Sequence, residues 1–267
     1  MDGASMMPLA GEAGAMQNTA GSDAPADGMN TALDEGDVLF REDFEEGTVG
    51  QTPAGWDTFI AWNANANNNP QGNTFALVGD EQVHAGGKAL HVSGGGEPAQ
   101  LTRPLPADTT RLYIRAYVRM SRQLGQNPGA NHETLFAIRG IPGAAHDEVR
   151  FGEIKGVIGT NEVPSDNISP RLEEWGKGPV VPANQWACIE VAFLGDEMPH
   201  QLRAWVDGQL VHEIDNPSED FQNGPLSDTW LAGHFQEVVI GWHSFSGQSA
   251  EVWIDDVVVA RAPIGCQ

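Results

Sequence analysis

The chain has 267 residues, a formal net charge of −23 and an isoelectric point near 4.4. This acidic balance argues against nucleic acids and anionic membranes as partners, because their negative charge would repel the protein. No apolar run reaches the roughly 18 residues that a membrane-spanning helix needs.

Residues 1–36 are predicted to form a disordered acidic leader. They contain no Lys, Arg or aromatic residue, so they cannot bury enough apolar surface to offset the entropy lost on ordering. Their composition resembles a spacer that follows an export signal or a lipid anchor. Residues 37–267 are expected to form one domain.

Short segments with an apolar residue at every second position follow, separated by turn residues. No segment has a helical period longer than two turns. An Asp-Gly pair at 207–208, between two apolar runs, predicts a tight hairpin. The pattern indicates an all-β fold, a single two-sheet antiparallel sandwich or jelly roll. The expected strands lie in VLFREDFE, KALHVSG, AQLTRPL, RLYIRAYVRM, HETLFAIRG, EVRFGEIKGVIG, WACIEVAFLG, HQLRAWVDGQLVHEI, QEVVIGWHSF and EVWIDDVVVA.

The strand Arg111–Met120 gathers scarce residue types on one face. Tyr113, Arg115, Tyr117 and Arg119 alternate there with apolar residues, and the two tyrosines are the only ones in the chain. Arginine binds carboxylates with two hydrogen bonds, and tyrosine offers a ring for sugar stacking. The pattern favours an anion-binding, sugar-stacking surface. The alternative is a solvated face with ordinary cross-strand pairs.

The chain contains two cysteines, Cys188 and Cys266. A pair of free thiols is possible, but Cys266 lies one residue from the C-terminus, where a covalent tether is useful. We expect a single disulfide, and therefore an oxidising compartment.

Asp255 and Asp256 stand side by side in the last expected strand. Successive strand residues point to opposite faces, so one of the two carboxylates must face the interior and needs a partner. Acidic residues also crowd the first strand, in REDFEEG, and the first and last strands of a sandwich often lie together. Carboxylates from both strands, with backbone carbonyls from HAGGKAL, would form an oxygen site suited to Ca²⁺. Alternatively, one Asp caps a turn and the other is solvated.

Six segments occur in the order found in the cellulose-induced protein family, which is similar to fungal glucuronan lyases. The resemblance covers residues 38–266 and implies a concanavalin-like, polysaccharide-lyase-like jelly roll with an open concave face. The segments are REDFEEG, VHAGGKALHVSGG, RLYIRAYVRM, GANHETLFAI, EVRFGEIKG and VVIGWHSFSGQSAEVWIDDVVVARAPIGC.

The same resemblance implies a structural calcium ion and a disulfide between Cys188 and Cys266. The implied calcium ligands are the side chains of Glu45 and Asp255 and backbone oxygens near Glu46, Ala85 and Lys88.

A lyase that acts on a uronate needs a cation to neutralise the carboxylate, a base, and an acid for the leaving oxygen. Arg150 and Arg115 are the expected cations, and Gln236 is a further candidate for substrate binding. A bulge at Gly152 would place Glu153 and Lys155 on the face of Arg150, and a regular strand would place them opposite. The candidates for proton transfer are His132, Tyr117, Lys155 and His243.

Phe245 departs from the family pattern. Glucuronan lyases carry Tyr at this point of the closing Gly-Trp-x-x-Tyr-Ser-Gly block, and a phenyl ring cannot transfer a proton. If that Tyr is the lyase base, this chain uses another base or is not a lyase. Paired acids of the laminarinase type are not expected to make it a glycoside hydrolase, because Asn216-Pro217 interrupts EIDNPSE.

The sequence therefore predicts a secreted, calcium-binding protein that cleaves a uronate-containing polysaccharide by β-elimination. The alternative is a non-catalytic polysaccharide-binding protein that accompanies biomass degradation. We expect a monomer, secreted or anchored by a lipid at a bacterial surface.

Overall fold

The computed structural model describes residues 33–144, 146–163 and 165–266. These residues form sixteen strands and one short 3₁₀ helix, and they contain no α-helix and therefore no helix able to span a membrane. The elements are β1 Val38–Glu42, β2 Asp57–Ile60, β3 Asn63–Ala64, β4 Phe75–Gly79, β5 Ala89–Gly94, β6 Ala99–Pro104, β7 Arg111–Met120, β8 His132–Arg139, β9 Glu148–Ile154, β10 Val157–Val163, β11 Asn167–Ser169, η1 Leu172–Glu174, β12 Trp186–Leu194, β13 Gln201–Val206, β14 Gln209–Ile214, β15 Glu237–Ser244 and β16 Ala250–Ala260.

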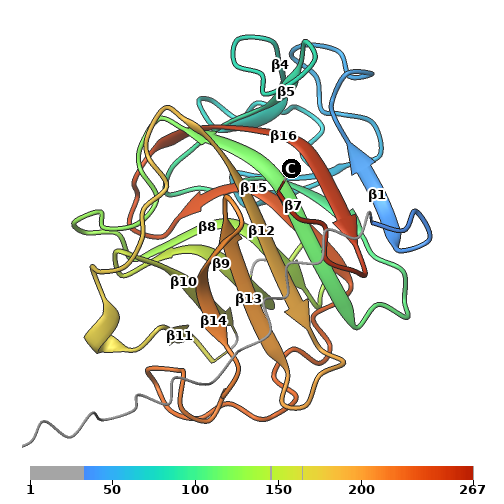
Figure 1. Ribbon diagram of the computed structural model, residues 1–267. Helices are drawn as coiled ribbons and strands as arrows, with labels where there is room; N and C mark the ends of the chain where they lie inside the picture. The colour runs from blue at the N-terminus through green and yellow to red at the C-terminus, as the bar shows by residue number, and fades with distance from the viewer. Residues whose placement is uncertain (1–32, 145, 164, 267) are drawn as a thin grey trace, which may run out of the picture. The chain divides into compact units, whose positions relative to one another are not determined.

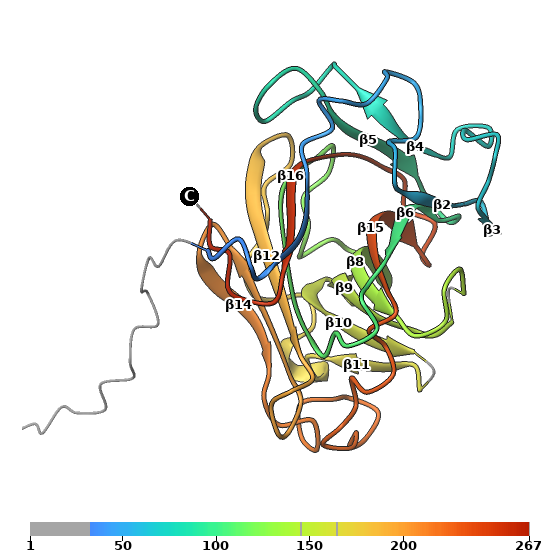
Figure 2. The same ribbon diagram turned by 90° about the vertical axis from the view of Figure 1, so that its right-hand side faces the viewer.

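The strands form two sheets that pack face to face (Figure 1). Sheet A has the order β14-β13-β12-β7-β16-β5-β4, with β1 also paired to β16, and sheet B has the order β11-β10-β9-β8-β15-β6-β2-β3. Every strand pairing is antiparallel. Figure 2 shows the two layers nearly edge-on. The predicted antiparallel sandwich is confirmed.

The core lies between the sheets and follows the period-two pattern. On sheet A, Ile114 and Val118 of β7 point inward, and Phe136 and Phe151 point inward from sheet B. Tyr113, Arg115, Tyr117 and Arg119 therefore face outward from sheet A. Arg150 lies between the inward residues Val149 and Phe151 of β9, so it faces outward from sheet B. The Tyr and Arg residues of β7 and the side chain of Arg150 therefore lie on opposite outer faces of the sandwich.

Two local predictions are confirmed. Asp207 and Gly208 connect β13 and β14 with φ values of 49° and 79°, the left-handed conformation that a two-residue hairpin turn requires. Cys188 and Cys266 form a disulfide with an S–S distance of 2.01 Å, which joins β12 to the C-terminal segment.

Of the two arrangements considered for Gly152, the structure has the regular strand and not the bulge. Strand β9 pairs regularly with β10 through Gly152, and the irregularity lies in β8, between Thr134 and Phe136. A Cβ atom at Gly152 would lie 1.9 Å from the carbonyl oxygen of Glu133, so only glycine allows this approach. Because β9 remains regular, Glu153 points away from the face of Arg150.

Most of the predicted leader lies outside the described residues. Leu33 already packs against a small apolar cluster that includes Tyr113 and Ile264. The packed region thus begins a few residues before the predicted boundary at residue 37.

Candidate functional site

The outer face of sheet B carries a buried network of charged side chains. Arg150 donates from Nε to Glu148 Oε2 (2.7 Å), and Arg139 donates from Nε and Nη2 to Glu148 Oε1 (3.0 and 2.6 Å). Arg139 also donates from Nη1 to Glu237 Oε1 (2.8 Å), and Arg150 from Nη1 to Asn161 Oδ1 (3.3 Å). None of the four charged residues is more than 3% exposed. Two positive and two negative charges balance, which makes their burial tolerable.

Aromatic rings cover this network. Phe245 lies over Arg150, with 4.5 Å between the ring centroid and Cζ, and Phe59 lies over Arg139 at 5.2 Å. Trp62 contacts Phe245 at 6.2 Å between centroids. Trp62 is 44% exposed and Phe245 is 38% exposed. The exposed rings of Trp62 and Phe245, beside the buried guanidinium groups, form a surface suited to sugar stacking.

His243 lies beneath these rings. Its ring centroid is 4.0 Å from that of Phe245 and 4.9 Å from that of Trp62, and the residue is 1% exposed. Burial, reinforced by the positive charge of Arg150 and Arg139, lowers the pKa of His243 to about 3. The imidazole is therefore neutral at physiological pH, and its Nε2 has no hydrogen-bond partner among the described residues.

A second unpartnered polar atom lies next to His243. Thr134 of β8 pairs with His243 of β15, so the two side chains share one face of the sheet. The hydroxyl of Thr134 is also buried without a partner among the described residues. Because buried polar groups are normally hydrogen-bonded, these two atoms mark a place where water or a ligand group would bind.

His132 completes the group on sheet B. Its ring centroid lies 6.3 Å from that of Phe245, and its Nδ1 lies 3.7 Å from Asp166 Oδ1. Burial lowers the pKa of His132, the carboxylate of Asp166 opposes this effect, and the ammonium group of Lys155 adds to it.

Lys155 lies at the turn between β9 and β10, with a φ of 52°. Its ammonium group donates to Asn131 Oδ1 and lies 5.6 Å from the ring centroid of Trp175. Lys155 and Trp175 line a hollow of about 350 Å³ that no histidine lines. Lys155 therefore acts on His132 through its charge.

Trp62 is held in place by an unusual turn. Ile60 of β2 pairs with Asn63 of β3, so Ala61 and Trp62 form a two-residue hairpin turn. Their φ values are 49° and 63°. Turns of this kind favour Asn and Gly, and other residues lose about 1–2 kcal/mol each in the left-handed region. Such strain concentrates at functional positions, where the surrounding structure maintains it.

The predicted Tyr and Arg residues of β7 lie on the opposite face of the sandwich. Tyr113 is 6% exposed and packs in the cluster that contains Ile264. Tyr117 stacks on His84 with 3.5 Å between ring centroids, and Arg115 lies 5.4 Å from the ring of Tyr117. Arg119 donates to the carbonyl of Asn184. Arg115 and Arg150 therefore cannot contact the same carboxylate, and Tyr117 cannot move a proton in the site on sheet B.

Gln236 also lies away from His132 and His243. It is exposed at the start of β15, where its backbone amide donates to the carbonyl of Arg139 at 3.0 Å. His243 follows seven residues later on the same strand, which corresponds to about 20 Å of extended chain. Gln236 can contact only a different part of a long ligand.

The residues predicted to bind calcium do meet at one end of sheet A. Glu45 Oε1 accepts hydrogen bonds from the backbone amides of Gly87 (2.8 Å) and Lys88 (2.9 Å). Asp255 Oδ2 accepts from the amides of residues 84 (2.8 Å) and 85 (3.2 Å). Glu46 is exposed. Within the described ranges, no three His, Cys, Asp or Glu side chains gather as a metal-binding group. Calcium binding stays a prediction.

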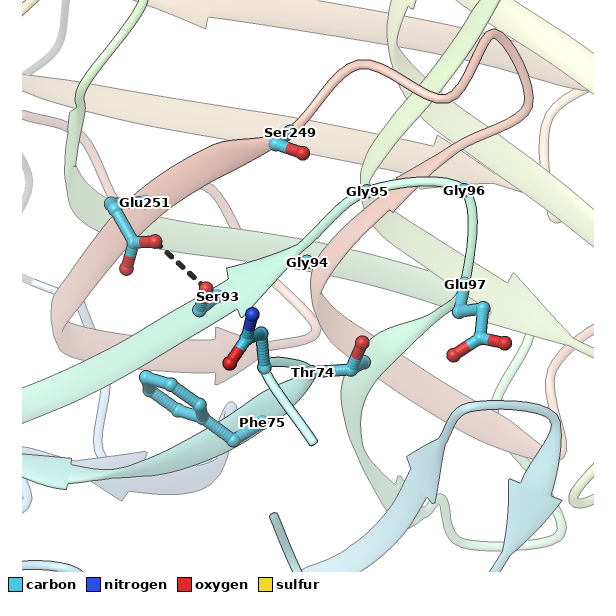
Figure 3. A pocket seen from close by; sticks show the side chains of 10 residues that line it. Thr74, Phe75, Ser93, Gly94, Gly95, Gly96, Glu97, Ser249 and Glu251 are labelled. Atoms are coloured by element: carbon cyan, nitrogen blue, oxygen red, sulfur yellow. Dashed lines mark hydrogen bonds between the residues drawn. The ribbon is translucent and has the colours of Figure 1, made fainter. Parts of the chain in front are cut away.

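A hollow of about 530 Å³ lies at the edge of sheet A (Figure 3). Ser93 donates to Glu251 Oε1 in this hollow at 2.7 Å. The hollow contains no Arg, Lys or His, and its two carboxylates would repel a uronate. We therefore do not place the uronate site there. The lining residues are Asn73, Thr74, Phe75, Ser93, Gly94, Gly95, Gly96, Glu97, Ser249 and Glu251.

Residues 51–262 match the family described as polysaccharide lyase-like, Cip1-like core domain. The chain belongs to this Cip1-like family. It is similar to the solved structure of the cellulose-induced protein Cip1, with a TM-score of 0.59 and 22% identity over 85% of this chain and 100% of that chain. An endo-β-1,4-glucuronan lyase from the fungus Trichoderma reesei is also similar, with a TM-score of 0.48 and 13% identity over 84% of this chain and 96% of that chain. No curated protein sequence matches the chain.

These comparisons confirm the family resemblance and the jelly-roll fold expected from the sequence. Sequence reasoning on this Cip1-like chain missed Trp62, Arg139 and Glu148 as parts of the site. Arg139 did carry a signal, since it is a charged residue that directly follows the apolar run LFAI of β8. Trp62 carried none, because Ala-Trp is not a turn sequence typical of a hairpin.

Proposed function

We propose that this Cip1-like protein binds a uronate-containing polysaccharide across the outer face of sheet B and cleaves it by β-elimination. The observation that carries the proposal is the arrangement of two neutral histidines beside a buried arginine network and two exposed rings: His243 contacts Trp62 and Phe245, and His132 lies near Phe245. Trp62 and Phe245 offer ring faces to the sugars. The unpartnered Nε2 of His243 lies buried beneath these rings, where a bound water would satisfy it.

His132 is the proposed base. In β-elimination, the base removes the proton from the carbon next to the carboxylate. The electron pair forms a carbon–carbon double bond, and the bond to the leaving oxygen breaks as that oxygen gains a proton. The positive field of Arg150 stabilises the negative charge that develops on the uronate, and the Lys155 ammonium group is the proposed proton donor. Asp166 orients His132 and supports its protonated form.

A second candidate function is polysaccharide binding without cleavage. Two observations favour it. Phe245 stands where the resemblance to glucuronan lyases implies a tyrosine. The guanidinium of Arg150 is 3% exposed and already donates to Glu148 and Asn161, so a substrate carboxylate would have to compete with these partners.

The proposed location is outside the cell. The disulfide between Cys188 and Cys266 supports this proposal, because disulfides persist in oxidising compartments. We propose secretion or attachment through a lipid anchor, and a monomer as the working form.

The test is ultraviolet absorbance of the unsaturated uronate product, measured with glucuronan, alginate, pectate and glucuronoxylan. We expect product with at least one of these polymers, and a loss of at least about 100-fold in rate for His132→Ala. His91→Gln is the matched control, because His91 lies in sheet A on β5. Its rate should equal that of the wild type.

Affinity electrophoresis on the same polymers separates the two candidates. Retardation without product formation, alongside an active control lyase, overturns cleavage and favours the binding function. Neither retardation nor product on any uronate polymer overturns both.

A further inference from the structure

The ammonium group of Lys88 bonds two backbone carbonyls. Its Nζ donates to the carbonyl oxygens of Glu45 (2.6 Å) and Gly47 (2.9 Å). Lys88 follows the glycine turn at 86–87, and Glu45 and Gly47 follow β1. The side chain of Lys88 thus ties the segment after β1 to the turn before β5. A half-buried ammonium with two carbonyl partners is a charge-assisted contact of the stronger kind.

The carboxylates predicted to bind calcium are already engaged by backbone amides. Both hydrogen bonds to Glu45 Oε1 come from the turn, and they lower the pKa of Glu45. Asp255 accepts two amides at Oδ2, and its Oδ1 accepts the amide of Asp256 at 2.8 Å. A calcium ion takes six to eight oxygen ligands. Here three of the four carboxylate oxygens of Glu45 and Asp255 accept backbone N–H groups, and the Lys88 ammonium group already bonds two carbonyls near Glu46.

The turn is shaped around the Glu45 carboxylate. Gly86 has a φ of 67°, and a Cβ atom there would lie 2.2 Å from Glu45 Oε1. The carboxylate therefore packs directly against the turn backbone, with no space between them for an ion. The donor set fits an internal ammonium group and does not fit calcium in this arrangement.

We infer that Lys88 is the built-in cation of this cluster, in the place where the family resemblance implies calcium. The positive charge that ties the segment after the first strand to the glycine turn comes from the chain itself. This inference is independent of the proposed polysaccharide site, because it concerns the opposite sheet.

Thermal unfolding of the full chain tests the inference. Wild-type protein should show the same Tm after treatment with excess EDTA and after addition of CaCl₂. Lys88→Met should lower the Tm by roughly 4–8 °C, because two carbonyls lose a charged donor. Lys177→Met is the matched control, because Lys177 is exposed and its ammonium group also bonds a backbone carbonyl, that of Glu173. Its Tm should stay within about 1 °C of the wild type.

A wild-type Tm that falls with EDTA or rises with CaCl₂ overturns the inference in favour of a bound divalent ion. A Lys88→Met protein with an unchanged Tm also overturns it. A rise in Tm with CaCl₂ in Lys88→Met, but not in the wild type, supports it, because the oxygen cluster then accepts an external cation only when its own is removed.

Discussion

Trp62 combines backbone strain with an exposed aromatic ring. It shares a tight turn with Ala61, both residues have positive φ values, and its ring is stacked on that of His146 with 6.1 Å between centroids. A turn with Asn-Gly would be less strained, but it would present no ring to a ligand. The backbone strain of this turn therefore accompanies the exposure of the Trp62 ring.

Replacement of Trp62 by Ala should weaken polysaccharide binding about tenfold, because a stacking ring contributes on the order of 1–1.5 kcal/mol. Isothermal titration with the polymer that the wild type binds measures the change. Trp205→Ala is the matched control, since Trp205 belongs to β13 of sheet A, and its affinity should not change.

Ala61→Gly separates strain from ligand contact in the same experiment. Glycine adopts positive φ freely, so this variant should keep the wild-type affinity and gain about 0.5–1 kcal/mol in the free energy of unfolding. A loss of stability in Ala61→Gly would show that the turn is not strained. Equal affinity of Trp62→Ala and wild type would remove Trp62 from the binding surface without touching the rest of the proposed site.

At the scale of elements, the charged network joins three strands of sheet B on its outer face. Arg139 of β8 contacts Glu148 of β9 on one side and Glu237 of β15 on the other. Burial raises the pKa of Glu237, and the contact with Arg139 opposes that rise. Such a network sets the position of the Arg150 guanidinium under Phe245, because each buried charge is stabilised by the opposite charges that it contacts.

Glu148→Gln should destabilise the fold by about 3 kcal/mol, because it leaves Arg139 and Arg150 buried without their shared carboxylate. Urea unfolding measures the loss. Glu213→Gln is the matched control: Glu213 pairs with Arg203 at 2.7 Å on the exposed face of sheet A, and its loss should cost less than about 1 kcal/mol. Similar losses in the two variants would contradict a special role for the buried network.

At the scale of the whole molecule, His212 links the two sheets. It lies on β14 of sheet A, and its Nε2 is 3.0 Å from the hydroxyl of Thr160 on β10 of sheet B. Burial lowers the pKa of His212 from 6.5 to about 4. This buried contact joins the two sheets, so protonation of His212 affects the packing of both.

Stability should fall as the pH drops from 6.5 to about 4. In this window the unfolded chain binds a proton at residue 212 and the folded chain does not, so protonation favours unfolding. The loss from His212 is about 3 kcal/mol. His212→Gln keeps a polar group near Thr160 but does not titrate, so its free energy of unfolding should depend less steeply on pH. Equal slopes in urea titrations of the two proteins would contradict the prediction.

The sequence by itself determined most of the strands, their inward faces, the hairpin at Asp207-Gly208 and the family. These features are readable because side-chain alternation and turn geometry are local properties, set within a few residues. Sequence reasoning missed the strands β2, β3, β4 and β11, which are short and lie outside the predicted segments. The disulfide was also predictable, because two cysteines allow only one pairing. For the candidate site, sequence reasoning identified Arg150, His132 and His243 as residue types suited to the chemistry.

Only the tertiary structure decided which residues share a face. Alternation shows that Tyr117 and Arg150 both point outward, but it does not show that β7 belongs to sheet A and β9 to sheet B. Likewise, the burial of Asp255 shows that its carboxylate needs a partner, but it does not show which one. The partner is the backbone of the turn at residues 84–85, about 170 positions away. Sheet membership and the partners of buried charges depend on pairings between distant segments, and the local pattern is compatible with several of these.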